Sequence, residues 1–71
     1  MAMMQFYYRV VVNACDLYLK DPVRAKEVQS GSKDVKKVRK IKEFAALAKH
    51  NPIRHIIYLD LDDLDLLYTY L

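Results

Sequence analysis

The chain has 71 residues, a formal net charge of +3 and a hydrophobic fraction of 54%. A chain of this length holds one domain, residues 1–71, whose core is thin because small domains bury a smaller share of their surface than large ones. Cys15 is the only cysteine, which excludes an internal disulfide and a cysteine-based zinc cluster. A partner subunit is therefore the expected source of additional stability.

The apolar content predicts self-association. A short chain with six tyrosines and this many hydrophobic residues cannot cover all of its apolar surface by itself. Tyrosine is common at interfaces, because its ring buries a large area while its hydroxyl group can still meet a polar partner. We therefore expect a homo-oligomer.

The longest apolar stretch does not have the pattern of a membrane span. Residues 3–19 are interrupted by Gln5, Arg9, Asn13 and Asp16, whereas a spanning helix needs about 20 predominantly apolar residues. We expect no membrane association and a cytoplasmic location, or a nuclear one where the host has a nucleus.

The first segment, residues 3–20, has the clearest helical periodicity. Its polar residues are separated by four, four, three and four positions and so form one narrow stripe on a helix; they are Gln5, Arg9, Asn13, Asp16 and Lys20. The aromatic run at residues 6–8 and the valine run at residues 10–12 favour a strand instead. The longer periodic pattern outweighs this local preference, so a helix is predicted.

Two further helices are expected in the middle of the chain. Asp21 and Pro22 have the pattern of an N-cap followed by proline at the first helical position, which predicts a short helix to about Val28. After a loop, Ser32 is expected to cap a longer helix that ends near His50. This helix has an apolar face and a basic face, the pattern of a surface helix.

The last segment is predicted to form a helix from Pro52 to about Tyr68, with Asn51 as its cap. Its apolar side recurs at heptad-like spacing, through Ile53, Ile57, Leu61, Leu64, Tyr68 and Leu71. Asp60 also falls on this apolar side. The helical pattern does not explain that position.

These segments predict an all-α fold, a small bundle of about three helices in which the first and last segments share the hydrophobic core. The alternative is a small α+β domain with strands near residues 5–12 and 55–62, because Ile57, Leu59 and Leu61 alternate with tyrosine and aspartate. Three alternations are fewer than the helical pattern offers, so the bundle is preferred.

A run of basic residues in the middle helix is the main candidate for function. Closely spaced cations on a helix can contact the phosphates of nucleic acid. The expected contacts are Lys33, Lys36, Lys37, Arg39, Lys40 and Lys42. The leading hypothesis is therefore an accessory or regulatory protein that binds nucleic acid, although a basic face also serves simply to keep a hydrophobic protein in solution.

No catalytic or metal site is expected. The acidic run at residues 60–65 is interpreted as a solvated face that pairs with the basic helix, within or between subunits. His50 and His55 lack the further ligands of a zinc site, and one glycine cannot form a Gly-rich phosphate loop. Cys15 is interpreted as a small buried hydrophobe. We predict no enzyme activity and no cofactor.

The alternative function is a protein-interaction or assembly module without a role in nucleic-acid binding. Its partner would be an acidic protein or another copy of the chain, and aromatic and leucine side chains of the first and last segments would anchor the contact. The expected interface residues are Tyr7, Tyr18, Tyr58, Leu61, Leu64 and Tyr68.

Overall fold

The computed structural model describes residues 3–50 and 55–71. Helices account for 77% of these residues, and a two-stranded antiparallel sheet is present beside them. The chain is therefore mostly helical, as expected, but the prediction of an all-α bundle of about three helices is matched only in part, because four α-helices and a small sheet are present among these residues. The α+β alternative places its strands near the observed ones. The predicted cap at residues 51 and 52 lies outside the described residues.

The first half of the chain contains a strand and two helices. Strand β1 spans Met3–Tyr7 and leads directly into helix α1, Tyr8–Lys20. The 3-10 turn η1, Pro22–Arg24, and the short helix α2, Ala25–Ser30, follow.

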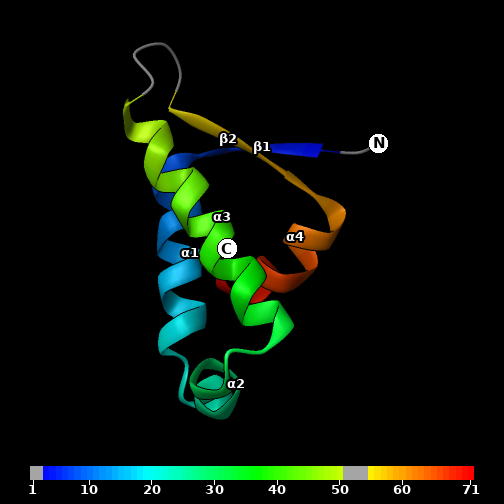
Figure 1. Ribbon diagram of the computed structural model, residues 1–71. Coiled ribbons are helices and arrows are strands. Elements are labelled where there is room, and N and C mark those ends of the chain that lie inside the picture. Colours follow the sequence, from blue (N-terminus) through cyan, green and yellow to red (C-terminus); the bar gives the residue numbers. More distant parts are fainter. Residues whose placement is uncertain (1–2, 51–54) are drawn as a thin grey trace.

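The second half begins with the longest helix, α3, Lys33–Leu47, which the 3-10 turn η2, Ala48–His50, extends. Strand β2, Ile56–Asp60, is followed without a break by helix α4, Leu61–Leu67, and by the 3-10 turn η3, Tyr68–Tyr70. Figure 1 shows α1 and α3 packed side by side, with the sheet crossing one end of the pair and α2 at the other end. Helix α4 lies below the sheet (Figure 1).

Helix α1 confirms the helical periodicity for residues 8–20. Its buried side chains recur every three or four positions, on the side opposite the polar stripe; they are Val11, Ala14, Cys15 and Tyr18. Residues 3–7 depart from the prediction because they pair with β2 as a strand. Pairing with a distant segment and burial of Phe6 against the core outweigh the helical pattern there.

The last segment corrects the prediction of one long helix. Residues 56–60 are extended and pair with β1, and the helix begins only at Leu61. The Asp60 side chain accepts a hydrogen bond from the backbone N–H of Asp63 at 2.9 Å, which makes Asp60 the N-cap of α4. An N-cap residue has an extended backbone. Asp60, which did not fit the apolar side of the predicted helix, therefore marks the boundary between strand β2 and helix α4.

The register of the sheet separates an inner face from an outer face. Met4 lies opposite Leu59, and Phe6 lies opposite Ile57. Directly opposed residues point to the same face of an antiparallel pair. Leu59 is 1% exposed, so this face covers the core, whereas Tyr58 on the outer face is 44% exposed.

The core lies between the two long helices, the sheet and α4. Its buried members come from all four of these parts of the fold: Val11, Ala14, Cys15, Tyr18, Val35, Val38, Ile41, Ala45, Leu59 and Leu67. Asp21 and Ser32 accept hydrogen bonds from the N–H groups of Val23 and Val35, so both predicted caps are confirmed. Between them, Gly31 ends α2 with a φ of 69°, a left-handed conformation that glycine adopts without steric cost.

We predict that Leu59→Ala lowers the free energy of unfolding by about 2–5 kcal/mol, because it leaves a cavity in the core. Tyr58→Ala, the neighbouring position on the outer face, should cost much less. Chemical denaturation followed by circular dichroism measures both. Equal losses at the two positions would contradict the assignment of faces.

Candidate interaction surfaces

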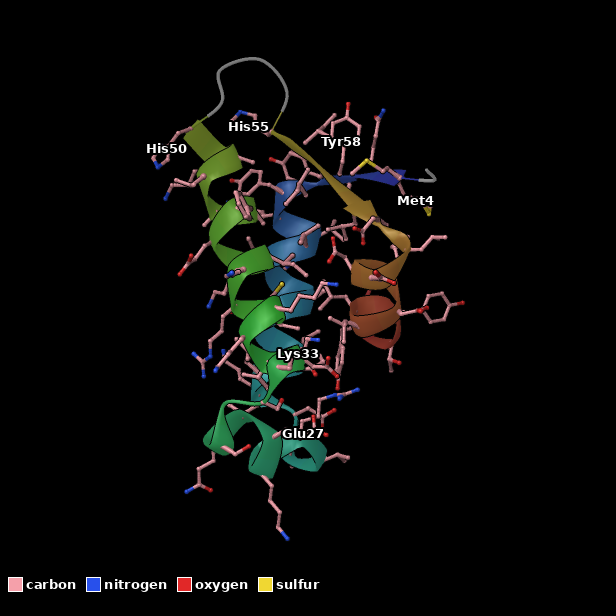
Figure 2. All side chains as sticks on the ribbon, turned by 45° about the vertical axis from the view of Figure 1, so that its right-hand side comes forward. Met4, Glu27, Lys33, His50, His55 and Tyr58 are labelled. Carbon is pink, nitrogen blue, oxygen red and sulfur yellow. The ribbon has the colours of Figure 1, made fainter. Side chains whose placement is uncertain are left out.

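The basic residues of α3 divide into two groups. The side of α3 that carries Val35, Val38, Ile41 and Ala45 is buried, which turns the opposite side to solvent. Four of the predicted nucleic-acid contacts are exposed and form what we call the basic face: Lys33, Lys36, Arg39 and Lys40. Figure 2 shows the Lys33 end of α3, near α2.

The other two predicted contacts form ion pairs within the chain. Lys42 Nζ lies 2.6 Å from Asp16 Oδ1 on α1, and Lys37 Nζ lies 3.6 Å from Asp63 Oδ1 on α4. These pairs tie α3 to the helix on each side of it. The Lys37 contact agrees with the interpretation of the acidic run as a partner of the basic helix.

The acidic run has a mixed electrostatic environment. Desolvation by burial raises the pKa of Asp63, and the nearby Asp60 carboxylate adds to this effect while Lys37 opposes it. The pKa of Asp60 is lowered, first by the hydrogen bond from the Asp63 backbone. Asp60 therefore has a structural role at the start of α4. Among residues 3–50 and 55–71, no three His, Cys, Asp or Glu side chains are grouped so as to hold a metal ion.

An apolar groove runs between β1 and the C-terminal end of the chain. We call it the β1 groove, and its walls are Met4, Phe6, Leu61, Leu64, Asp65, Tyr68, Thr69 and Leu71. The exposed fraction is 53% for Met4, 61% for Leu61 and 78% for Tyr68. These side chains are large and apolar, and solvent reaches them in the isolated chain.

A second apolar groove lies on the other side of the sheet, between β2 and α3. Its walls are Ile41, Phe44, Ala48, Ile56, Ile57, Tyr58, Leu59 and Asp63. Phe44 is 66% exposed, so part of this surface is also open to solvent. The sheet therefore has an apolar groove along each of its two edges.

The predicted interface residues fall in three different places. Leu61, Leu64 and Tyr68 line the β1 groove, and Tyr7 and Tyr58 are exposed on or beside the outer face of the sheet. Figure 2 shows Tyr58 and Met4 at the sheet end of the molecule. Tyr18 differs from the others, because it is fully buried and packs in the core of the single chain.

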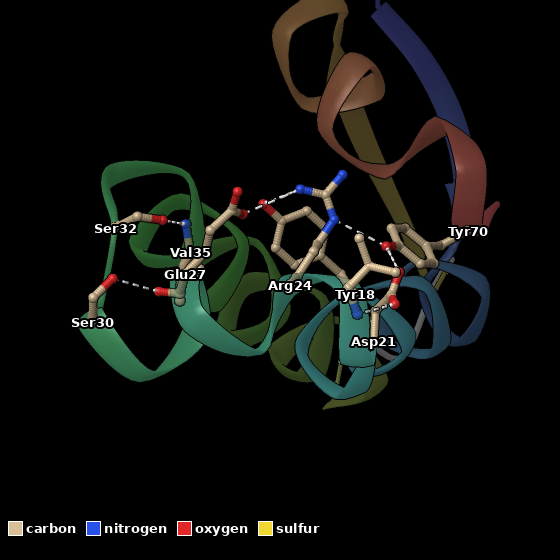
Figure 3. Close-up of polar contacts among 9 residues, drawn as sticks. Tyr18, Asp21, Arg24, Glu27, Ser30, Ser32, Val35 and Tyr70 are labelled. Atoms are coloured by element: carbon tan, nitrogen blue, oxygen red, sulfur yellow. Dashed lines mark hydrogen bonds and ion pairs between the residues drawn. The ribbon is translucent and has the colours of Figure 1, made fainter.

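A polar cluster that the sequence did not indicate joins η3, near the C-terminus, to the end of α1 and the turn η1 (Figure 3). The Arg24 guanidinium lies 4.3 Å from the centre of the Tyr18 ring, and its Nε donates to the Tyr70 hydroxyl at 2.9 Å. The Tyr70 hydroxyl in turn donates to Asp21. We call these residues the C-terminal clasp: Tyr18, Asp21, Arg24 and Tyr70.

The clasp changes the titration of its members. The hydrogen bond from Tyr70 lowers the pKa of Asp21, and burial raises the pKa of Tyr18. Asp21 and Tyr70 are 49 positions apart in sequence, so no local motif predicts their contact. The only sequence signal was Arg24 following the cap at Asp21, which is too common a pattern to identify a site.

The remaining candidates have structural surroundings. Cys15 is fully buried, which confirms its interpretation as a small hydrophobe, and burial raises the pKa of its thiol to about 11. His55 Nδ1 lies 3.2 Å from the carbonyl oxygen of Ala48, where η2 begins, and His50 is exposed. Within the described ranges, no helix is both long and apolar enough to cross a membrane.

Comparisons with protein-family models, with curated proteins and with solved structures find no match to this chain. The arguments for function therefore rest on its own residues.

We predict that Tyr70→Phe lowers the free energy of unfolding by about 1 kcal/mol, since it removes the hydroxyl that links Arg24 to Asp21. Tyr68→Phe is the matched control, because this tyrosine is 78% exposed and should lose almost nothing. Urea denaturation at neutral pH compares them. An equal effect of the two substitutions would contradict a role for the clasp.

The stability difference between wild type and Tyr70→Phe should depend on pH. The pKa of Asp21 is lower in the folded state, so its contribution is present above the ordinary carboxyl pKa and is lost as the pH falls through the lowered value. The difference between wild type and Tyr70→Phe should therefore shrink in acid.

Proposed function

We propose that the chain is a non-enzymatic protein-interaction module that assembles through the β1 groove. The observation that carries this proposal is the exposure of several large apolar side chains around one groove, led by Tyr68 at 78% and Leu61 at 61%. Contiguous apolar surface of this kind on a small domain is typical of an interface. The polar members Asp65 and Thr69 match the mixed composition of interface margins.

The energetics of a small domain favour the same proposal. The chain buries ten hydrophobic residues, yet twelve large hydrophobic side chains are exposed among the described residues. Covering a large apolar side chain contributes about 1.5–3 kcal/mol, so a partner on the groove would add appreciably to a stability that is small in domains of this size.

We predict that Tyr68→Lys weakens self-association at least tenfold, because it places a charge in the groove that a partner would cover. Val23→Lys is the matched control, since Val23 is 91% exposed and does not line the groove. Sedimentation velocity over a range of protein concentrations measures the association. Equal association of the two variants would refute the role of the β1 groove.

A second candidate function is nucleic-acid binding through the basic face. It is favoured by the exposure of Lys33, Lys36, Arg39 and Lys40 on one helix, where they take part in none of the ion pairs between described residues. Against it, Lys37 and Lys42 are engaged with aspartates of α4 and α1. Carboxylates next to the basic face would repel phosphates.

We predict, for this second function, salt-dependent binding of a labelled oligonucleotide that is lost when Lys33, Lys36 and Lys40 are replaced by glutamine. The matched control replaces Lys20, Lys26 and Lys49, which removes the same charge from exposed positions outside the basic face. Fluorescence anisotropy at several salt concentrations measures both. An equal loss in the two triple variants would indicate a response to net charge alone.

A further inference from the structure

The hydrogen-bond pattern of the sheet shows which backbone groups of β1 face outward. Tyr8 N–H donates to the carbonyl oxygen of His55 at 2.9 Å, one position beyond the end of the two strands. In an antiparallel pair, hydrogen-bonded and non-hydrogen-bonded residue pairs alternate. Met4 and Phe6 therefore direct their N–H and C=O groups toward β2.

The residues between them face the other way. Met3, Gln5 and Tyr7 direct their backbone groups to the open edge of β1, since the sheet has only two strands within the described residues. The Tyr7 carbonyl is at the N-cap of α1, where it accepts the first bond of that helix. The N–H of Tyr7 and both backbone groups of Gln5 remain available at the open edge, as does the Met3 carbonyl.

Strand β1 lacks three of the features that commonly prevent edge strands from pairing. Edge strands are commonly protected by charged side chains, proline or a bulge. Strand β1 contains no charged residue and no proline, and its register with β2 is unbroken over all five positions. Four of its five residues are exposed.

We propose that β1 pairs with β1 of a second copy of this chain, antiparallel and centred on Gln5, to form a continuous four-stranded sheet. This inference rests on the proposed function and names its partner and geometry. The two Gln5 residues would exchange two backbone hydrogen bonds across the two-fold axis. The Tyr7 N–H of each copy would donate to the Met3 carbonyl of the other.

The same register joins the two β1 grooves. With Gln5 on the axis, Met4 of one copy lies directly opposite Phe6 of the other, in a non-hydrogen-bonded pair, where side chains come closest. Both residues are on the inner face and line the groove. Methionine and phenylalanine make favourable sulfur–aromatic contacts. Each groove thus becomes part of one shared apolar layer below the sheet.

A second copy covers this surface better than an unrelated strand does. A single added strand would satisfy the backbone groups of β1 but would bring nothing to cover Leu61 and Tyr68, which lie on the α4 side of the groove. The copy brings its own α4 to the same layer. An uncharged strand with glutamine at its centre also opposes itself without placing like charges together.

The first experiment removes the outward N–H at the centre of β1. Gln5→Pro should weaken self-association at least tenfold, because proline has no N–H to donate across the open edge of β1. The hydrogen bonds of Met4 and Phe6 to β2 should remain, since the N–H of residue 5 does not point toward β2. Gln5→Thr is the control, since it keeps the N–H and suits a strand. Sedimentation velocity gives the association and circular dichroism checks the fold.

The second experiment uses charge at the axis and does not depend on proline being tolerated. Gln5→Lys and Gln5→Glu should each weaken association, because the two-fold axis brings each charge against its copy. An equimolar mixture of the two variants should associate at least as tightly as wild type. Only a contact that brings position 5 against itself predicts this recovery.

The outcomes separate this inference from the proposed function. If Tyr68→Lys disrupts association while the Gln5 variants behave as wild type, the groove is an interface and the edge pairing is wrong. A mixture of charged variants that does not recover, or a wild-type chain that stays monomeric at millimolar concentration, also overturns the edge pairing. If Tyr68→Lys has no effect, the proposed function itself is refuted.

Discussion

The antiparallel pairing of β1 with β2 is the contact on which the rest of the structure depends. It joins residues near the two ends of the chain and lays Leu59 and Phe6 over the end of the α1–α3 pair. A two-stranded sheet has little stability by itself, so this one depends on the helices below it as much as they depend on it for cover. The pairing also fixes which backbone groups of β1 remain open.

Local sequence patterns predicted the elements whose structure is determined locally. The caps at Asp21 and Ser32 and the periodicity of α1 involve residues within a few positions of one another, and the structure confirms them. The sequence pattern supports the strands only as an alternative to the helical bundle. Residues 3–7 and 56–60 become extended because they pair with residues 49 to 57 positions away, a contact that no helical wheel contains.

The candidate surfaces were predictable to different degrees for the same reason. A run of lysines on one helix face is visible in sequence, so the sequence predicts Lys33, Lys36 and Lys40 as exposed cations. The engagement of Lys42 with Asp16 was not visible, since it depends on how α1 packs against α3. The clasp between Arg24 and Tyr70 was missed entirely, because it forms only when the end of the chain returns to α1.

The distribution of apolar surface follows from the order of the elements. Helices α1 and α3 supply most of the core, and only Leu59 and Leu67 are buried among residues 55–71. After the turn from β2 into α4 at Asp60, Leu61, Leu64 and Tyr68 line the groove beside β1, where the described residues supply no further element to cover them. The exposed groove and the open strand edge therefore arise from one feature, a sheet whose last strand among the described residues is β1. A partner strand that pairs with the open edge of β1 therefore lies next to the β1 groove, where the rest of the partner can cover it.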